Sequence, residues 1–180
     1  MGFGTSTVKV ESILQGGGIL KKVLICCVVL LFLNLWGCMM RSVNVPPNSY
    51  SPISAINIVQ NNYHLNFTDV VDNVYSVRAK GMVASFGKEE KAYLLYVFKG
   101  DSSSVKEHWK ALVKELGIWK ARTYLDFPSS GLYSISVNGK KIIAWWKKAW
   151  FFVAESSADT EEFADHVMDV YKQLEEGTAW

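Results

Sequence analysis

The chain has 180 residues, of which 49% are hydrophobic, 20% are charged and four are proline, a composition typical of folded globular proteins and not of disordered or fibrous ones. The net charge of +2 arises before residue 38, where Lys9, Lys21 and Lys22 are opposed by Glu11 alone, so the rest of the chain has no net charge. Nucleic-acid-binding domains concentrate Lys and Arg on one face. We therefore expect no nucleic-acid partner.

Residues 20–37 have the order of a signal peptide. Lys21 and Lys22 precede a long apolar run, and the small residue Gly37 stands immediately before Cys38. Residues 1–19 precede the basic pair that normally opens such a signal. We interpret them as an extension created by a misassigned start codon, with translation beginning near Leu20.

The tetrapeptide Leu35-Trp36-Gly37-Cys38 resembles the lipobox of bacterial lipoproteins. The resemblance implies cleavage before Cys38, attachment of acyl chains such as palmitate to its thiol, and a lipid-anchored location on the cell membrane or envelope with the domain facing outward. The other cysteines, Cys26 and Cys27, also lie in the leader, so Cys38 has no partner for a disulfide in the exported part. The resemblance covers the leader alone and implies no activity.

An uncleaved transmembrane helix is the main alternative. Val23–Met40 contains only Asn34 as a strongly polar residue, and its length is close to the roughly 20 residues that span a bilayer. The basic pair before this run, against Arg41 alone after it, would still place the following domain outside. Secretion without any anchor is a third outcome.

Residues 38–50 are expected to form a tether, because Pro46, Pro47, Asn48 and Ser49 disfavour regular structure. The exported domain then covers residues 51–180. At its start, Ser51 followed by Pro52 favours the first turn of a short helix.

Apolar residues repeat at helical spacing over 105–116 and again over 163–174, which predicts two amphipathic helices. Ser104 and Glu107 have the spacing of a capping box for the first helix, and Gly117 follows its last apolar residue. The pair Asn138-Gly139 predicts a type I′ hairpin turn. Strands are expected over 74–86, 92–98, 119–127, 132–137, 141–146 and 150–154. The fold class predicted is α+β, a mostly antiparallel sheet with element order ββαββββα.

No catalytic or metal-binding motif is found in the sequence. His64, His108 and His166 show no ligand spacing, and Ser102–Ser104 lack the surroundings of a nucleophile or a phosphate loop, so the serines are interpreted as a helix cap. Glu155, with the acidic residues that follow it, is interpreted as part of a solvated helix start. We expect no metal and no cofactor, and an enzyme would need a site formed only in the fold.

The most informative residues are aromatic. Trp145, Trp146, Trp150 and Phe152 fall on two neighbouring predicted strands, and adjacent side chains of a strand point to opposite faces. Both faces of the sheet therefore need cover, while two helices suffice for one. Either the segment 53–67 closes the second face and these aromatics are core, or they form a binding face for a protein or a small apolar or carbohydrate ligand.

These observations favour a membrane-tethered envelope lipoprotein that acts as a non-catalytic binding or interaction module. A structural or assembly subunit held by an uncleaved helix is the first alternative. An enzyme is the second.

Overall fold

The computed structural model describes residues 42–177, which include a compact unit that begins at Val43. Its elements in chain order are α2 (Pro52–Asn57), η1 (Ile58–Asn61), β1 (His64–Val74), β2 (Val77–Lys88), β3 (Lys91–Lys99), α3 (Ser102–Leu116), η2 (Ile118–Lys120), β4 (Thr123–Asp126), β5 (Ser130–Val137), β6 (Lys140–Lys147), β7 (Trp150–Ser156) and α4 (Thr160–Glu175). No helix within residues 42–177 is long and apolar enough to cross a membrane. The segment expected to enter the membrane, residues 20–40, lies outside the described residues.

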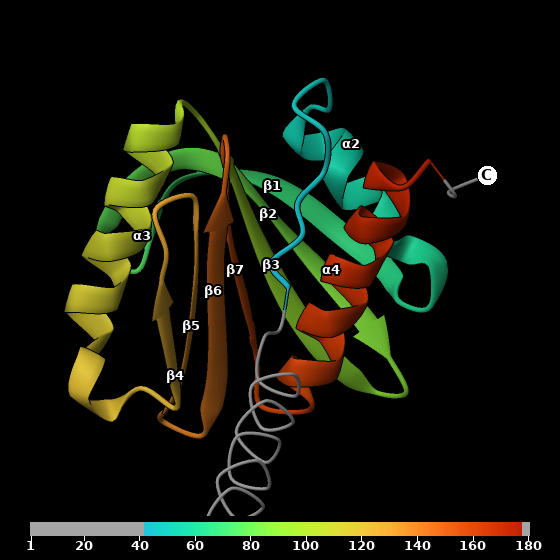
Figure 1. The fold of residues 1–180 in the computed structure, drawn as a ribbon. Helices are drawn as coiled ribbons and strands as arrows, with labels where there is room; N and C mark the ends of the chain where they lie inside the picture. Colours follow the sequence, from blue (N-terminus) through green and yellow to red (C-terminus); the bar gives the residue numbers. More distant parts are fainter. Residues whose placement is uncertain (1–41, 178–180) are drawn as a thin grey trace, which may run out of the picture. The chain divides into compact units, whose positions relative to one another are not determined.

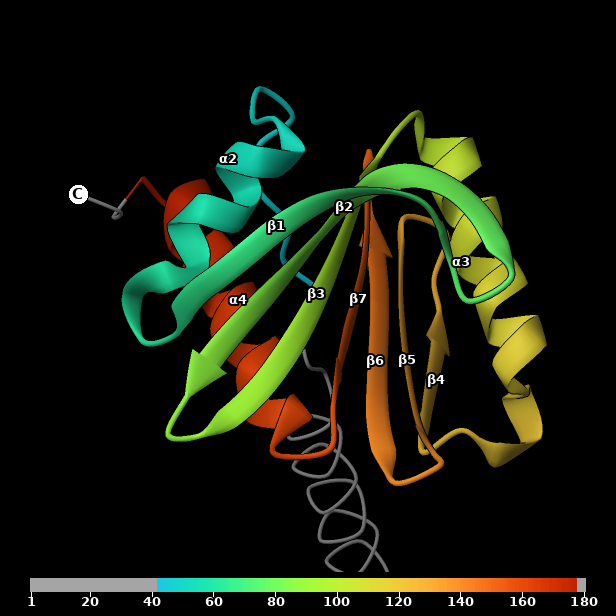
Figure 2. The same ribbon diagram turned by 180° about the vertical axis from the view of Figure 1, so that it is seen from behind.

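The seven strands form one antiparallel sheet in the order β1-β2-β3-β7-β6-β5-β4 (Figures 1 and 2). Two meanders, β1 to β3 and β4 to β7, meet where β3 pairs with β7. The predicted α+β class is confirmed. The predicted element order lacks α2 and the strand β1. The strand predicted over 74–86 corresponds to β2 and begins where β1 ends, since Val74 pairs with Val77 across a two-residue turn at Tyr75 and Ser76.

Local signals at turns and helix ends predicted most boundaries. Ser51 accepts a hydrogen bond from the Ser54 amide and caps α2, and Asn138 and Gly139 have the positive φ values, 50° and 77°, that their turn requires. The predicted capping box is wrong. Asp101 caps α3 by accepting from the Ser104 amide at 2.9 Å, and Ser104 lies inside the first turn. The strand predicted over 119–127 is also too long, since η2 occupies its first residues.

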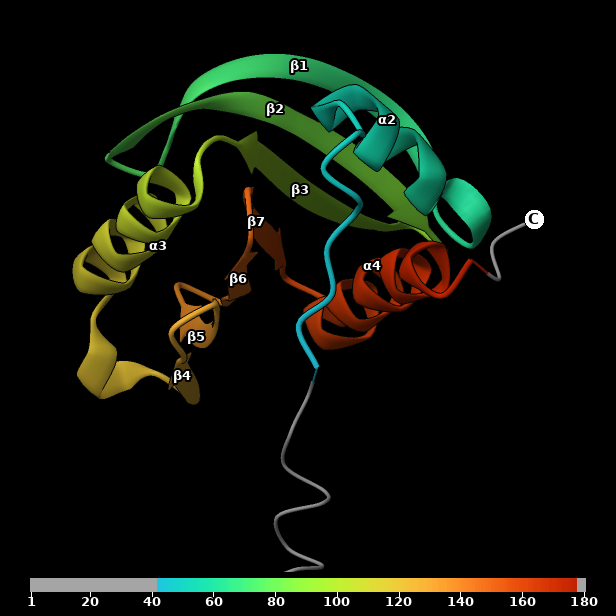
Figure 3. The ribbon, with the colours of Figure 1, turned by 45° about the horizontal axis from the view of Figure 1, so that its top comes forward.

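Both faces of the sheet are covered by helices, with α3 on one face and α2 and α4 on the other (Figure 3). Two hydrophobic cores result. The core under α3 includes Phe98, Val105, Trp109, Leu112, Tyr133, Ile135, Ile142, Trp146, Phe151 and Val153. The core under α4 includes Val45, Ile56, Val59, Tyr63, Phe86, Leu95, Trp145, Trp150, Phe152, Phe163, Val167 and Tyr171.

The predicted tether is shorter than expected, because residues 43–50 belong to the folded unit. Val45 is fully buried in the core under α4. The Lys99 ammonium donates to the carbonyl oxygens of Asn48 at 2.7 Å and Tyr50 at 2.6 Å. The prolines disfavour a helix or a strand in this segment, but they do not prevent it from packing against the core. Among the described residues, both cores are built from Val43 onward. A fragment that begins at Val43 therefore contains all the side chains of these two cores.

We expect Gly131→Ala to lower the free energy of unfolding by about 1–3 kcal/mol, because the added methyl group overpacks a core that is already filled. Gly131 pairs with Trp146 across β5 and β6, and a Cβ atom there would contact the Trp146 indole and lie 2.9 Å from Cη2 of Trp109. Urea denaturation of the Val43–Trp180 fragment measures the change. Gly100→Ala is the matched control, since its Cβ would have its nearest neighbour at 3.5 Å. Equal midpoints for the two variants would contradict this packing.

Candidate functional site

The four aromatic residues predicted as a binding face lie in the two cores. Trp145, Trp146, Trp150 and Phe152 are each at most 1% exposed. The predicted alternation holds, because Trp145 packs under α4 and Trp146 under α3. The open face does not form, since α2 and the residues around it close the second face together with α4. The alternative interpretation, that these aromatics are core, is the one that the burial supports.

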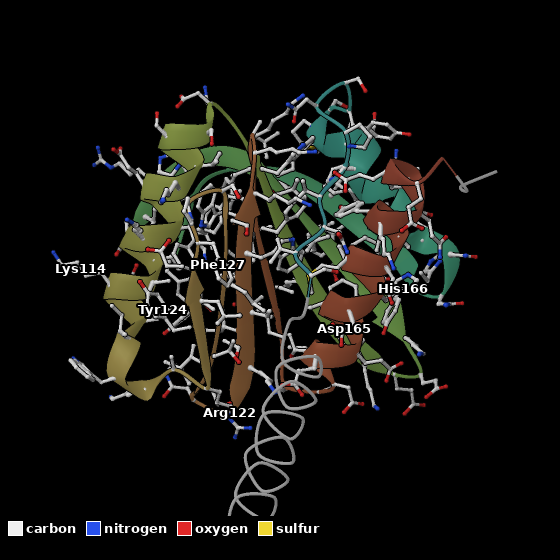
Figure 4. All side chains as sticks on the ribbon, viewed as in Figure 1. Lys114, Arg122, Tyr124, Phe127, Asp165 and His166 are labelled. Atoms are coloured by element: carbon white, nitrogen blue, oxygen red, sulfur yellow. The ribbon has the colours of Figure 1, made fainter. Side chains whose placement is uncertain are left out.

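The histidines are distributed over separate elements. His64 is exposed on β1, His108 lies on α3, and His166 lies on α4, where its Nε2 is 3.0 Å from the Val59 carbonyl oxygen (Figure 4). Within residues 42–177 no group of three or more potential ligands is arranged to hold a metal ion. Ser102–Ser104 form the first turn of α3 and do not cap it, contrary to the prediction; the hydroxyl of Ser103 donates to the carboxylate of Asp101, the residue that caps the helix, at 2.5 Å. Cys38 lies outside the described residues.

A cavity of about 320 Å³ opens between the β1–β2 turn and the β5–β6 hairpin. Its lining combines aromatic rings, a carboxylate, an ammonium group and an amide. The lining residues are Tyr75, Tyr96, Val137, Asn138, Lys140, Ile142 and Glu155. Few polar groups converging on a concave, partly apolar site are typical of small-molecule binding sites.

Glu155 is the central group of this cavity. Strand alternation places it on the α3 face of β7, in phase with the buried residues Phe151 and Val153, and it is 6% exposed. A buried carboxylate is costly unless it is paired. Here the Tyr75 hydroxyl donates to Oε2 at 2.5 Å and the Lys140 ammonium to Oε1 at 3.1 Å. The Lys140 side chain is 55% exposed and lies at the mouth of the cavity.

Tyr75 reaches Glu155 from a strained turn. Its φ is +53°, a region in which side chains other than glycine are uncommon, and Ser76 follows it in the same turn. The Ser76 amide donates to both carboxylate oxygens of Glu115 on α3, at 3.1 and 3.2 Å. The end of α3 therefore holds the turn that carries the phenol into the cavity.

The two tyrosines of the cavity are neutral hydrogen-bonding groups over the physiological pH range. Burial raises the pKa of Tyr75, and its hydrogen bond to Glu155 raises the pKa further. Burial, followed by the nearby charge of Glu155, also raises the pKa of Tyr96. The lining offers donors, one anion and one cation, which suits the binding of a polar ligand.

Sequence reasoning placed Glu155 among solvated acids before the second helix, and so missed this site. A signal was present: Glu155 ends an uninterrupted apolar run in the phase of Phe151 and Val153. Its partner Lys140 lies on β6, the strand before it in the same hairpin, but Tyr75 is 80 residues away in the chain, and only the fold brings it to Glu155.

We expect the free energy of unfolding to fall as the pH rises above about 10, and to fall less steeply in Tyr75→Phe. Above the ordinary tyrosine pKa of 10.0 the unfolded chain loses the Tyr75 proton while the folded protein retains it, so the unfolded state binds fewer protons. The slope should decrease by up to one proton in the variant. Urea denaturation at a series of pH values between about 9 and 11 measures it. Identical slopes would contradict the placement of Tyr75.

Residues 47–174 match a protein family described as "Protein of unknown function (DUF3242)". Among solved structures, the chain is similar to a GTP binding regulator from Thermotoga maritima, with 37% sequence identity and a TM-score of 0.68. The alignment covers 76% of this chain and 98% of that one. No curated protein matches the chain.

Proposed function

The chain belongs to the DUF3242 family, and we propose that it is a non-catalytic binding module, tethered to a membrane through Cys38, whose ligand site is the cavity around Glu155. The observation that carries the proposal is the buried Glu155 carboxylate, held at an open cavity by a strained Tyr75 and a half-exposed Lys140. A buried charge and a strained turn both cost folding free energy. Such features cluster at binding sites, where they serve recognition.

The tether is supported by the lipobox-like residues Leu35–Cys38 and by the absence of any cysteine after Cys38. The assembly subunit and the enzyme remain the alternatives. The cavity favours binding over catalysis, because the hydroxyl paired with its one carboxylate is the phenol of Tyr75, whose raised pKa disfavours the phenolate that a nucleophile would need.

We expect the protein extracted from membranes to begin at Cys38 and to carry the added mass of acyl chains. Intact-mass and peptide mass spectrometry measure both properties. Cys38→Ser removes the thiol that would accept the lipid, so we expect the acyl mass to be absent in this variant. Wild-type protein that retains residues 20–37 and has no acyl mass would instead support an uncleaved membrane helix.

A guanine nucleotide is the ligand that we propose first for the cavity. The similar protein from Thermotoga maritima is described as a GTP binding regulator. In this chain, the Glu155 carboxylate is suited to accept hydrogen bonds from the N1 and N2 groups of guanine, and Lys140 at the mouth attracts phosphate. The sequence contains no P-loop, so the base and not a phosphate cradle would provide specificity. A carbohydrate is the second candidate, since tyrosine rings with a carboxylate and an amide also suit sugar hydroxyls.

We expect GTP to bind the Val43–Trp180 fragment at least about tenfold more tightly than ATP, because adenine lacks the donors that Glu155 would accept. Glu155→Gln should weaken GTP binding by about tenfold or more. Isothermal titration calorimetry measures both ratios, with a disaccharide titrated in parallel. Asp126→Asn is the matched control, because Asp126 pairs with Lys106 and Lys110 instead of lining the cavity. Equal affinities for GTP and ATP, or no effect of Glu155→Gln, would exclude guanine recognition here.

A further inference from the structure

Trp119 in η2 is 99% exposed, and its neighbour Ile118 is 43% exposed. Tryptophan carries the largest apolar side chain, and most tryptophans in folded proteins are largely buried. A wholly exposed one next to an exposed isoleucine marks a surface that contacts something other than water.

The backbone around Trp119 is fixed at several points. The Tyr133 hydroxyl donates to the Gly117 carbonyl at 3.0 Å, immediately before η2. After it, the Ala121 amide donates to the Ile118 carbonyl at 3.1 Å, and the Arg122 amide to the Ser134 carbonyl at 2.8 Å. The fold itself therefore presents the indole to the outside.

Basic side chains flank this projection. Lys114, Lys120 and Arg122 form no ion pair within the part of the chain that the structure describes. Earlier on the same helix, Lys106 and Lys110 both lie close to Asp126, at 4.0 and 3.6 Å. In Figure 4, Lys114 points away from the side of the domain formed by α3, and Arg122 lies at its lower edge.

We infer that the η2 segment, Trp119 and Ile118 with Lys114, Lys120 and Arg122, docks on the surface of an anionic lipid bilayer. Tryptophan prefers the level of the lipid headgroups, where its ring is in apolar surroundings and its N–H remains hydrated. Lys and Arg next to it are attracted by anionic headgroups. An exposed aromatic with unpaired cations is the pattern of a membrane-surface contact.

The length of the chain before the domain places a bilayer within reach, and this step rests on the proposed tether at Cys38. The folded unit begins at Val43, and five residues extend to about 17 Å at most. In Figure 3 the start of the described chain and β4, which follows η2, lie along the same lower edge of the domain. One flat surface can therefore meet both the tether and the η2 segment.

Co-sedimentation of the Val43–Trp180 fragment with vesicles tests the surface without the tether. We expect it to bind vesicles of phosphatidylcholine and phosphatidylglycerol, and to bind pure phosphatidylcholine much more weakly. Trp119→Ala should reduce the partition coefficient about tenfold, and Lys120→Glu and Arg122→Glu by about fivefold or more each. Phe67→Ala, 53% exposed on β1 at the other edge of the sheet, is the matched control and should bind like wild type.

A second experiment restores the tether. Cys38 is the sole cysteine of a Cys38–Trp180 fragment, so a maleimide lipid couples there alone. When Trp180 is replaced by Phe, every tryptophan of this fragment other than Trp119 is buried. The emission of Trp119 is then the difference between this protein and the same protein with Trp119→Phe. We expect brominated lipids in the anionic vesicle to quench that difference.

The inference is overturned if Trp119→Ala binds the vesicles as well as wild type does, or if the emission of Trp119 is not quenched in the tethered fragment. In either case a protein partner or a second copy of the chain is left as the occupant of this surface. Neither outcome depends on whether cells acylate Cys38. Unchanged thermal unfolding of each variant confirms that the substitution acts on the surface.

Discussion

Strands β3, β6 and β7 carry large apolar side chains on both faces, so neither face of the sheet can be left to water. Trp145 and Trp146, adjacent in sequence, lie in different cores and are both buried. The domain must therefore provide cover on two sides. It does so with α3 on one face and with α4, α2 and the segment from Val43 on the other. The demand for a second cover explains why a proline-containing segment without regular structure is packed and not free.

The aromatic cores also carry an internal cost. The indole N–H of Trp109 donates to the Ala144 carbonyl at 3.3 Å, but those of Trp145, Trp146 and Trp150 have no acceptor among the described residues. A buried donor without an acceptor costs about 1–3 kcal/mol. The stacking of Trp145 and Trp150 on Phe152, at centroid distances of 5.1 and 5.8 Å, and the large apolar area that these rings bury oppose that cost. These side chains stabilise the fold, and recognition is assigned to groups at its surface.

The candidate site and the exposed η2 segment both depend on α3. Glu115, near the end of this helix, holds the turn that directs Tyr75 toward Glu155. Two residues later, Gly117 ends the helix, and two residues after that the chain projects Trp119 outward. The last residues of α3 thus link η2, which we propose contacts a membrane surface, to Tyr75 of the cavity. The proposed ligand site and the proposed membrane surface are neighbours in the fold.

The sequence by itself determined the α+β class, the positions of both long helices, the Asn138-Gly139 turn and the alternation of Trp145 and Trp146, because each of these depends on periodicity or on the conformational preference of one or two residues. It did not predict the turn at Tyr75, which has no glycine or asparagine to mark it, or the extent of η2. Nor did it bring Tyr75 to Glu155, which is 80 residues away in the chain. Only the tertiary structure decided that the second face is closed, that Val45 is core, and that Tyr75 meets Glu155. The reason is physical: strand order and the cover of each face depend on pairings between distant segments, and local preferences carry no information about them.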